Sequence, residues 1–267
     1  MKEMKLWKWA LLLVGGTLVF LLLYALLPGL VKAMPVLWLQ MPALVAVAVL
    51  LLVLYSLWVR KVERQPVTDL PMDRVVPDTG RGFLMGLLYI SLTVGILALC
   101  GCYRVASVHF VALPFILNVF SFLVVAVGEE LVFRGIIFRM IDRRFNLTAA
   151  LVVSAALFGG THIMNDGATL WSSVAIAIEA GLLLGAAYKV SGNLWLPIGI
   201  HWGWNFFQGN IFGFAVSGGD AGSSLIQPSV QGPVILTGGA FGAEASVIAM
   251  VLGVLLSVWF IVKVAKR

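Results

Sequence analysis

The stretch "FVALPFILNVFSFLVVAVGEELVFRGIIF", residues 110–138, is long and apolar enough to cross a membrane, yet it carries three charges. A membrane-spanning helix needs about 20 mostly apolar residues. On insertion scales, a charged side chain near the bilayer centre costs about 2.5–3.5 kcal/mol, so such charges are rare without a function. Glu129, Glu130 and Arg134 therefore mark this stretch as a membrane span that contributes to a polar site.

The composition of the whole chain places this span in a polytopic membrane protein. Of the 267 residues, 61% are hydrophobic and only 11% are charged, whereas an average soluble domain is about 25% charged. Hydropathy predicts an all-α membrane bundle of about eight transmembrane helices. The predicted spans cover residues 7–27, 36–59, 83–103, 110–138, 149–164, 170–188, 194–212 and 244–263.

The basic residues predict how the chain is oriented in the membrane. With a cytoplasmic N-terminus, fifteen of the 18 Lys and Arg residues fall in cytoplasmic segments, Lys32 and Arg104 fall outside, and Arg134 lies within a span. This bias follows the positive-inside rule, so the net charge of +6 does not indicate nucleic acid as a partner. The sequence predicts a multi-pass protein of the cell membrane with both termini cytoplasmic.

Two polar connections divide the chain into three parts. The linker at residues 60–81 contains three prolines and mixed charges, which predicts a surface loop with a short amphipathic piece. The external connection at residues 213–243 is rich in Gly and Ser, lacks Lys and Arg, and is expected to have no catalytic role. We expect two N-terminal spans plus the linker at residues 1–82, a core at 83–212, and the external loop plus the last span at 213–267.

The spacing of the charges in the fourth span separates two roles for its carboxylates. Glu130 and Arg134 are four residues apart, so they lie one above the other on a helix face and can form an ion pair. Such a pair lowers the cost of burying either charge. Glu129 is rotated from Glu130 by about 100° on a helix of 3.6 residues per turn. It need not share the pair, and it is the better candidate for a base.

Polar residues on two other spans extend this set. His162 ends the fifth span in "LFGGTH", and His201 and Asn205 are one turn apart in "GIHWGWN". Glu179, on the sixth span, is interpreted instead as a hydrogen-bond partner between helices. A carboxylate, two imidazoles and an amide in one cavity could activate water directly as a general base or on a Zn²⁺ ion. They could also stabilise an oxyanion, so the set predicts hydrolysis of an acyl bond, with a peptide favoured.

These residues resemble the motifs of the CPBP intramembrane proteases. That group holds the CAAX prenyl endopeptidases and bacterial abortive-infection or bacteriocin-processing relatives. The family patterns E-E-x-x-x-R, F-x-x-x-H and H-x-x-x-N are similar to "EELVFR", "FGGTH" and "HWGWN" at residues 129–134, 158–162 and 201–205, in the same order. The resemblance covers roughly residues 83–212, which would form the catalytic core. The stretch "GPVILTGGAFGAEAS" at 232–246 is also similar to a bacterial subgroup.

The resemblance implies an intramembrane endopeptidase of the metallo- or glutamate type, with Glu130 and Arg134 as supporting residues. Glu129 would activate water together with His162, while the other catalytic residues would bind the oxyanion or complete a metal site. The implied catalytic residues are Glu129, His162, His201 and Asn205. Zn²⁺ held by Glu129, His162 and His201 is left open, because the chain lacks the H-E-x-x-H zinc signature. We expect a peptide or membrane-protein substrate reached from the cytoplasmic side, and not a prenylated protein.

Two other classes of protein stay open at this stage. A proton-coupled transporter would use the buried carboxylates and histidines as a relay, although the matched broken helices of many transporters are not visible. A non-catalytic membrane scaffold would keep the motifs for folding or for binding a partner. Cleavage of a peptide library separates an enzyme from a scaffold, and flux in proteoliposomes separates a transporter from both.

Overall fold

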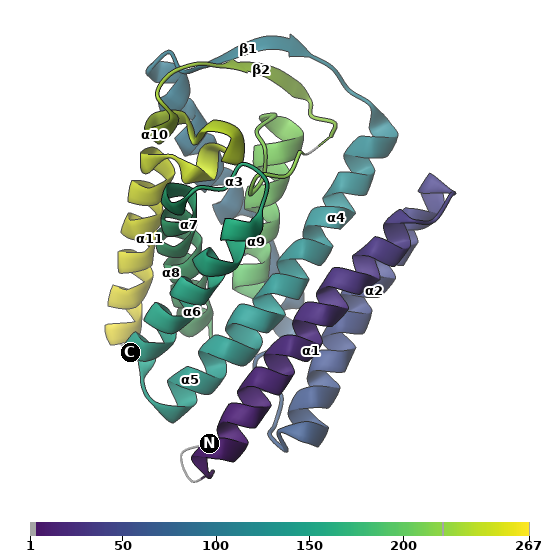
Figure 1. The fold of residues 1–267 in the computed structure, drawn as a ribbon, viewed down its shortest axis with the longest axis vertical. Helices are drawn as coiled ribbons and strands as arrows, with labels where there is room; N and C mark the ends of the chain where they lie inside the picture. Colours follow the sequence, from purple (N-terminus) through teal and green to yellow (C-terminus); the bar gives the residue numbers. More distant parts are fainter. Residues whose placement is uncertain (1–3, 221, 267) are drawn as a thin grey trace.

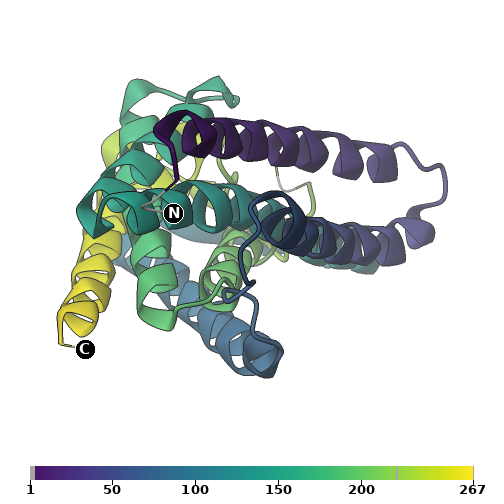
Figure 2. The ribbon, with the colours of Figure 1, turned by 90° about the horizontal axis from the view of Figure 1, so that it is seen from below.

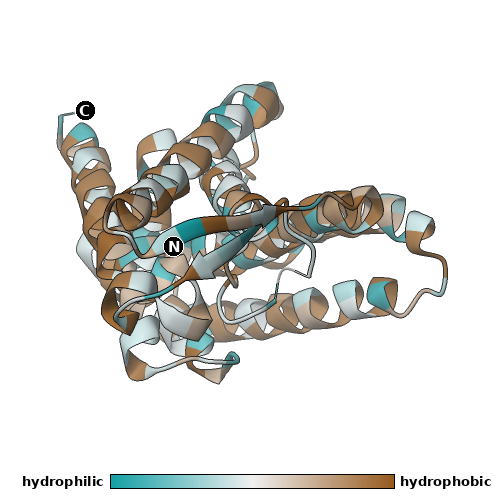
Figure 3. Cartoon of the chain, turned by 90° about the horizontal axis from the view of Figure 1, so that it is seen from above, coloured by the Kyte–Doolittle hydropathy of each residue, from teal (hydrophilic) through white to brown (hydrophobic). Residues whose placement is uncertain are grey.

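The computed structural model describes residues 4–220 and 222–266, which are mostly helical (Figure 1). Within these residues, seven helical stretches are long and apolar enough to cross a membrane. They are Leu6–Lys32, Leu37–Val62, Met72–Leu99, Ala112–Arg144, Leu147–Met164, Leu170–Ser191 and Val247–Ala265. The predicted polytopic helical membrane bundle is confirmed. Seen from above, the helices present mainly hydrophobic residues along their length (Figure 3).

The predicted span at 194–212 is helical but shorter than a full crossing. Helix α9 (Trp195–Phe206) continues into the π-helix η6 (Phe207–Ile211). At a rise of 1.5 Å per residue the two together reach at most about 25 Å, whereas the hydrocarbon core is about 30 Å thick. Ten of the 12 residues of α9 are buried, so α9 is an inner helix surrounded by the longer ones.

Paired glycines allow α9 to lie directly against α3 (Val75–Leu99). Gly82 and Gly86 on α3 face Gly199 and Gly203 on α9, each pair separated by one helical turn. A Cβ at Gly82 would lie 2.3 Å from the carbonyl oxygen of Leu196, so any side chain there would force the helices apart. Small residues at this spacing are typical of closely packed membrane helices. This contact holds the part of α9 that carries two of the predicted catalytic residues.

The fourth span is one continuous helical stretch with a change of helix type at its motif. Helix α4 (Ala112–Glu130) becomes the π-helix η3 (Leu131–Phe138) and then α5 (Arg139–Arg144). π-helical turns are found frequently at functional sites. Helices α1 (Leu6–Lys32) and α2 (Leu37–Leu57) form a hairpin that extends along α4 (Figures 1 and 2).

The predicted surface loop at residues 60–81 is correct only for residues 63–71, since both ends of the stretch are helical. Helix α2 continues through the π-helix η1 (Trp58–Val62), and a 3₁₀ turn η2 (Met72–Arg74) leads into α3. Pro77 is tolerated because it lies in the first turn of α3, where the backbone N–H has no helical partner. Glu63 and Asp69 in the remaining loop are buried and lie 2.7 and 3.6 Å from Arg139 nitrogens. These ion pairs hold the linker against α5.

The remaining helices and a small sheet complete the bundle. The fifth span is α6 (Leu147–Thr161) with the 3₁₀ turn η4 (His162–Met164); the sixth is α7 (Leu170–Ile176), the π-helix η5 (Ala177–Gly181) and α8 (Leu182–Ser191). Short turns α10 (Val234–Thr237), η7 (Gly239–Phe241) and η8 (Ala243–Ala245) precede the last helix, α11 (Val247–Ala265). Strands β1 (Tyr103–Val108) and β2 (Ile226–Val230) pair antiparallel. The sequence analysis did not predict this sheet.

The two ends of the molecule are distinct. The N-terminal segment, the C-terminal end of α11 and the α5–α6 turn lie at one end, where Arg144 donates a hydrogen bond of 2.6 Å to the Met4 carbonyl. Lys189 and Asp142 form an ion pair of 2.6 Å at the same end. The β1–β2 sheet and the connection at 213–243 lie at the opposite end (Figure 1). Two residues of the predicted basic bias, Lys2 and Arg267, lie outside the described residues.

This arrangement leads to a topology prediction. Both ends of the described chain share one side, and the positive-inside bias predicts that this side is cytoplasmic. Reporter fusions next to Lys189 and within the 213–243 connection should therefore give opposite signals. Matching signals at the two positions would contradict this path through the membrane.

Candidate active site

A cavity of about 410 Å³ lies where α1, α4, the end of α6, α9 and part of the external connection meet. It is lined by all four residues that the resemblance implies are catalytic: Glu129, His162, His201 and Asn205. They come from three separate helical segments and are brought together only by the fold. The expected shared cavity is present.

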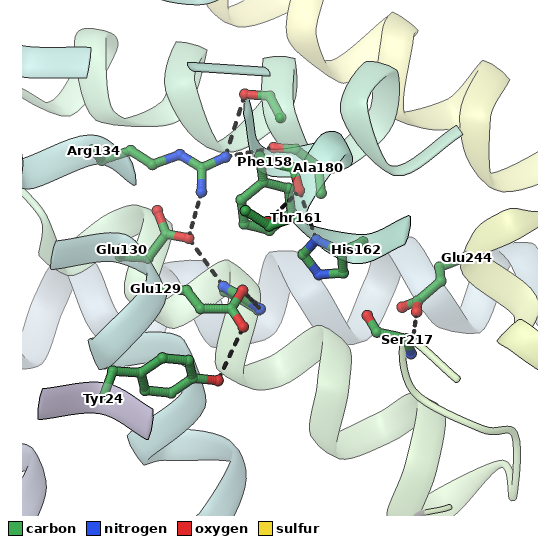
Figure 4. A network of polar contacts seen from close by, with 12 residues as sticks. Tyr24, Glu129, Glu130, Arg134, Phe158, Thr161, His162, Ala180, Ser217 and Glu244 are labelled. Atoms are coloured by element: carbon green, nitrogen blue, oxygen red, sulfur yellow. Dashed lines mark hydrogen bonds and ion pairs between the residues drawn. The ribbon is translucent and has the colours of Figure 1, made fainter. Parts of the chain in front are cut away.

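The ion pair predicted from the spacing of Glu130 and Arg134 is present beside this cavity (Figure 4). Arg134 Nη1 lies 2.9 Å from Glu130 Oε1, and both side chains are fully buried. Arg134 Nη2 donates to the Ala180 carbonyl at 2.9 Å, and the guanidinium carbon lies 4.7 Å from the centre of the Phe158 ring. The pair neutralises two buried charges and connects η3 to α6 and η5.

Glu129 has one carboxylate oxygen occupied and one without a partner. Tyr24, on α1, donates its hydroxyl hydrogen to Glu129 Oε1 at 3.0 Å. Glu129 Oε2 is buried and accepts no hydrogen bond from the described residues. Buried polar atoms without partners are rare and require an explanation. At the edge of a cavity, this oxygen is free to accept a proton or to bind a water molecule.

His162 is held in one tautomer by the backbone. Its Nδ1 lies 2.7 Å from the Phe158 carbonyl oxygen. A carbonyl can only accept, so Nδ1 carries the hydrogen and donates it. In the neutral ring, Nε2 then keeps its lone pair and can accept a proton. The motif F-x-x-x-H thus contributes a backbone acceptor one turn before the histidine that it orients.

His201 is oriented by the second carboxylate of the fourth span. Its Nδ1 lies 3.0 Å from Glu130 Oε1, the same oxygen that accepts from Arg134, and its Nε2 lies 3.9 Å from Glu129 Oε2. A carboxylate bound to one ring nitrogen sets the tautomer and leaves the other nitrogen for chemistry. Glu130 therefore supports the site through His201, while Glu129 faces the cavity.

Asn205 lies one turn after His201 and is 95% buried, with 5% of its surface exposed. Its side-chain amide forms no hydrogen bond within the residues described, so its N–H groups are available to a bound molecule. Glu179, by contrast, does not line the cavity and accepts a hydrogen bond of 2.6 Å from the Tyr89 hydroxyl. This agrees with its interpretation as a partner between helices.

The external connection, which is expected to have no catalytic role, contributes a wall of the cavity. Val216, Ser217 and Gly219 line the cavity together with the catalytic candidates. The sequence analysis also missed Glu244, which is 1% exposed and accepts a hydrogen bond from the Ser217 N–H. Burial raises the pKa of Glu244 to about 7, although hydrogen bonds from Ser217 and Gln208 oppose the shift.

The cavity lies toward the end of the molecule that is opposite to the termini. Asn165 and Asp166, which line it, follow the end of α6 that is distant from Arg144. The wall at 216–219 belongs to the connection beyond η6, at the same end. The termini and this part of the cavity lining thus lie toward opposite ends of the molecule, so the expected cytoplasmic termini and the expected access from the cytoplasm stay two separate predictions.

The residues as placed do not form a complete metal centre. Across residues 4–220 and 222–266, no group of three His, Cys, Asp or Glu side chains is arranged so that it could hold a metal ion. This includes the predicted zinc ligands Glu129, His162 and His201. Zinc stays a prediction from the resemblance.

Comparison with known proteins supports the family resemblance. Residues 110–207 match the family model described as Type II CAAX prenyl endopeptidase Rce1-like. The match includes the three motifs and ends before the external connection and the last helix. No curated protein and no solved structure matches the chain. The resemblance to the CPBP and CAAX protease family is thus confirmed for the part of the chain that carries the motifs.

Proposed function

Starting from this match to a family of membrane endopeptidases, we propose that the protein is a membrane-embedded peptidase in which Glu129 and His162 activate the attacking water. One observation carries the proposal: Glu129 Oε2, buried and without a hydrogen-bond partner, belongs to a residue that lines the same cavity as His162, His201 and Asn205. Glu130 and Glu179 also have a buried carboxylate oxygen without a hydrogen bond, but Glu129 is the one of the three that lines the cavity, which suits a catalytic base.

The proposed reaction begins with proton transfer from water. Glu129 Oε2 takes one proton from a water in the cavity, and His162 Nε2 accepts the second hydrogen bond of that water. The water oxygen forms a bond to the carbonyl carbon of the substrate, whose oxygen becomes negatively charged. The proton on Glu129 then moves to the amide nitrogen, and the C–N bond breaks to release an amine. General acid–base catalysis of this kind contributes about 10²–10⁴ in rate.

His201 and Asn205 would stabilise the charged oxygen of the intermediate. The Asn205 amide offers N–H donors, and the protonated His201 ring offers Nε2–H while its Nδ1–H stays bound to Glu130. Donors that are already in place when charge develops are worth about 10²–10³ in rate. The positions of both side chains are set by the glycine contact between α3 and α9.

The cavity also supports a proposal for the substrate and its direction of approach. Phe122, Val125 and Met164 line it beside the polar residues, which suits a peptide or a segment of a membrane protein with apolar side chains. The basic bias keeps the termini cytoplasmic, so we assign access to the outer side of the membrane. A prenylated protein held at the cytoplasmic face would not reach this cavity.

A peptide library and two histidine variants test the proposed function. Purified wild-type protein is expected to cleave some peptides, and His162→Ala should do so about 100-fold more slowly, because the attacking water loses the acceptor that helps Glu129 to orient and activate it. His109→Ala is the matched control, since His109 is the remaining histidine and lies outside the cavity. A folded wild type that cleaves nothing would favour the scaffold, and substrate or proton flux in liposomes would favour the transporter.

The same two preparations test the zinc prediction. One ion per wild-type chain, lost in His162→Ala, is the result expected if these residues bind zinc. Equal metal content in the two proteins would contradict binding through His162.

A further inference from the structure

The stretch "GGAFGAEAS" at 238–246 lies outside the family match, yet it contacts the cavity wall. Three of its glycines, Gly238, Gly239 and Gly242, have positive φ angles of 80°, 60° and 123°, which side chains rarely adopt. A Cβ at Gly242 would lie 2.2 Å from the Ala215 carbonyl oxygen. The glycines therefore allow this stretch to pass directly against residues 215–219, which we call the wall segment.

The wall segment is held by hydrogen bonds from four directions. Gln208 donates to the Ala215 carbonyl at 2.7 Å, and Asn165 donates to the Ser217 carbonyl at 2.9 Å. Gly218 N–H donates to the Phe241 carbonyl at 2.8 Å, and Glu244 Oε1 accepts from Ser217 N–H. Within the segment, Val216 and Gly219 exchange two backbone hydrogen bonds of 2.9 Å. An external loop without a function would not need so many anchors.

Ser217 adopts an unusual backbone conformation at the point where Glu244 binds. Its φ is +50°, and only one other described residue that is not glycine, Arg64, has a positive φ. Such conformations cost about 1–3 kcal/mol and cluster at functional sites, where the surroundings maintain them. The Glu244 side chain accepts the hydrogen bond from the N–H of this residue.

Glu244 is itself placed rigidly and close to the catalytic histidines. It lies three residues before the start of α11, whose first turn is capped by the Ser246 side chain, and the neighbouring Ala245 carbonyl accepts from the Trp171 indole at 2.8 Å. Glu244 and Ser217 line a small enclosed space together with His162 and His201. The view in Figure 4 places Glu244 and Ser217 on the other side of His162 from Glu129.

We propose that Glu244 is a positioning residue of the active site, whose carboxylate holds the wall segment in place as the substrate-facing wall of the cavity. The proposal rests on the proposed peptidase function only for the identity of the substrate, an extended peptide. Most backbone groups of the wall segment already form hydrogen bonds, so the wall acts mainly by its shape. Its small side chains leave room for the peptide beside Glu129 and His162. If the wall segment were displaced, the peptide could bind with its scissile bond away from these two residues.

Two substitutions of Glu244 test whether its side chain acts by holding the wall segment in position or by its charge. Glu244→Gln removes the charge but keeps an oxygen at the same distance to accept from Ser217, so it should retain the wall. Glu244→Asp keeps the charge but is shorter by one methylene, so it should lose the contact. Glu244→Gln is therefore expected to behave like the wild type and Glu244→Asp is not. Asp220→Ala is the matched control, because Asp220 is in the same connection and, among the described residues, its side chain accepts a hydrogen bond only from the nearby Gly222 N–H.

Thiol labelling measures the wall without relying on catalysis. In a Cys100→Ser, Cys102→Ser background, Val216→Cys provides one thiol on the wall segment. Maleimide labelling of this thiol should be about tenfold faster with Glu244→Asp, because loss of the hydrogen bond to Ser217 eases local opening. Glu244→Gln and Asp220→Ala should leave the rate unchanged. A Glu244→Asp rate equal to that of the wild type overturns the proposal, as does a Glu244→Gln rate as fast as that of Glu244→Asp.

Two further measurements complete the test: the activity of the Glu244 variants, and the labelling rate after removal of a second hydrogen bond to the wall segment. In a protein that cleaves peptides, Glu244→Asp should lower kcat/KM by about tenfold and Glu244→Gln should restore it. If the wild type cleaves nothing, the peptidase function fails while labelling still decides the position of the wall. If Glu244→Asp does not fold, Asn165→Ala removes another anchor from an exposed side chain and should also speed labelling. An unchanged rate there overturns the proposal.

Discussion

Replacement of Glu129 by glutamine is expected to slow peptide hydrolysis by a factor of about 10²–10⁴. Glutamine has nearly the same shape, so it can still accept the hydrogen bond from Tyr24, but it cannot take a proton from water. The unfolding midpoint in detergent should therefore stay close to that of the wild type. Initial rates on a cleaved peptide, measured beside thermal unfolding, give both quantities from one preparation.

A second buried carboxylate is the matched control for this variant. Glu179 is fully buried, accepts a hydrogen bond from Tyr89 and does not line the cavity. Glu179→Gln should keep the wild-type rate, because its amide oxygen can accept the same bond. If Glu179→Gln and Glu129→Gln lose activity equally, the loss reflects buried charge in general and the assignment of Glu129 as the base is wrong.

Arg134→Ala is expected to lower the free energy of unfolding by about 3–5 kcal/mol, because it leaves Glu130 buried without its partner. The variant also removes the guanidinium that binds the Ala180 carbonyl and packs on the Phe158 ring. Protein yield and the unfolding midpoint should both fall. Denaturant or thermal unfolding in detergent measures the effect directly.

The double variant Glu130→Gln, Arg134→Met separates the unpaired charge from lost packing. With both charges removed, no ion is left buried, and much of the stability lost in Arg134→Ala should return. Activity should stay low, because a neutral side chain at position 130 no longer favours the protonated His201 ring that the proposed oxyanion contact requires. An Arg134→Ala protein that is as stable as the wild type would show that the ion pair is not a structural element, and Arg134 would then need a different role.

Local spacing predicted part of this site well. The Glu130–Arg134 pair follows from the helix repeat alone, since residues four apart on one helix meet whatever the tertiary fold. The same argument separated Glu129 from that pair. The family motifs predicted which distant residues share the cavity, and helix geometry could not have done so.

Contacts between distant segments could not be predicted in this way. Tyr24 lies in an apolar first span, and nothing in the sequence indicates which helix it contacts. Glu244 follows a Gly-rich stretch that is typical of a loop. The prolines of the linker predict a loop, whereas Pro77 lies in the first turn of α3. A proline in a loop and a proline in the first turn of a helix cannot be told apart from the sequence. The loop residues that line the cavity could not be predicted either, because the position of a residue along its helix does not say which loops cover it.

Hydrolysis of a library peptide in H₂¹⁸O tests the central claim most directly, namely that Glu129 activates a water in this cavity to cleave a peptide bond. The purified wild-type protein, in proteoliposomes, is expected to yield a product whose new carboxyl group carries one ¹⁸O atom, and Glu129→Gln is expected to yield almost none of it. Mass spectrometry of the products measures both. Absence of cleavage by the folded wild type, or ¹⁸O-labelled product formed equally fast by Glu129→Gln, would contradict the account.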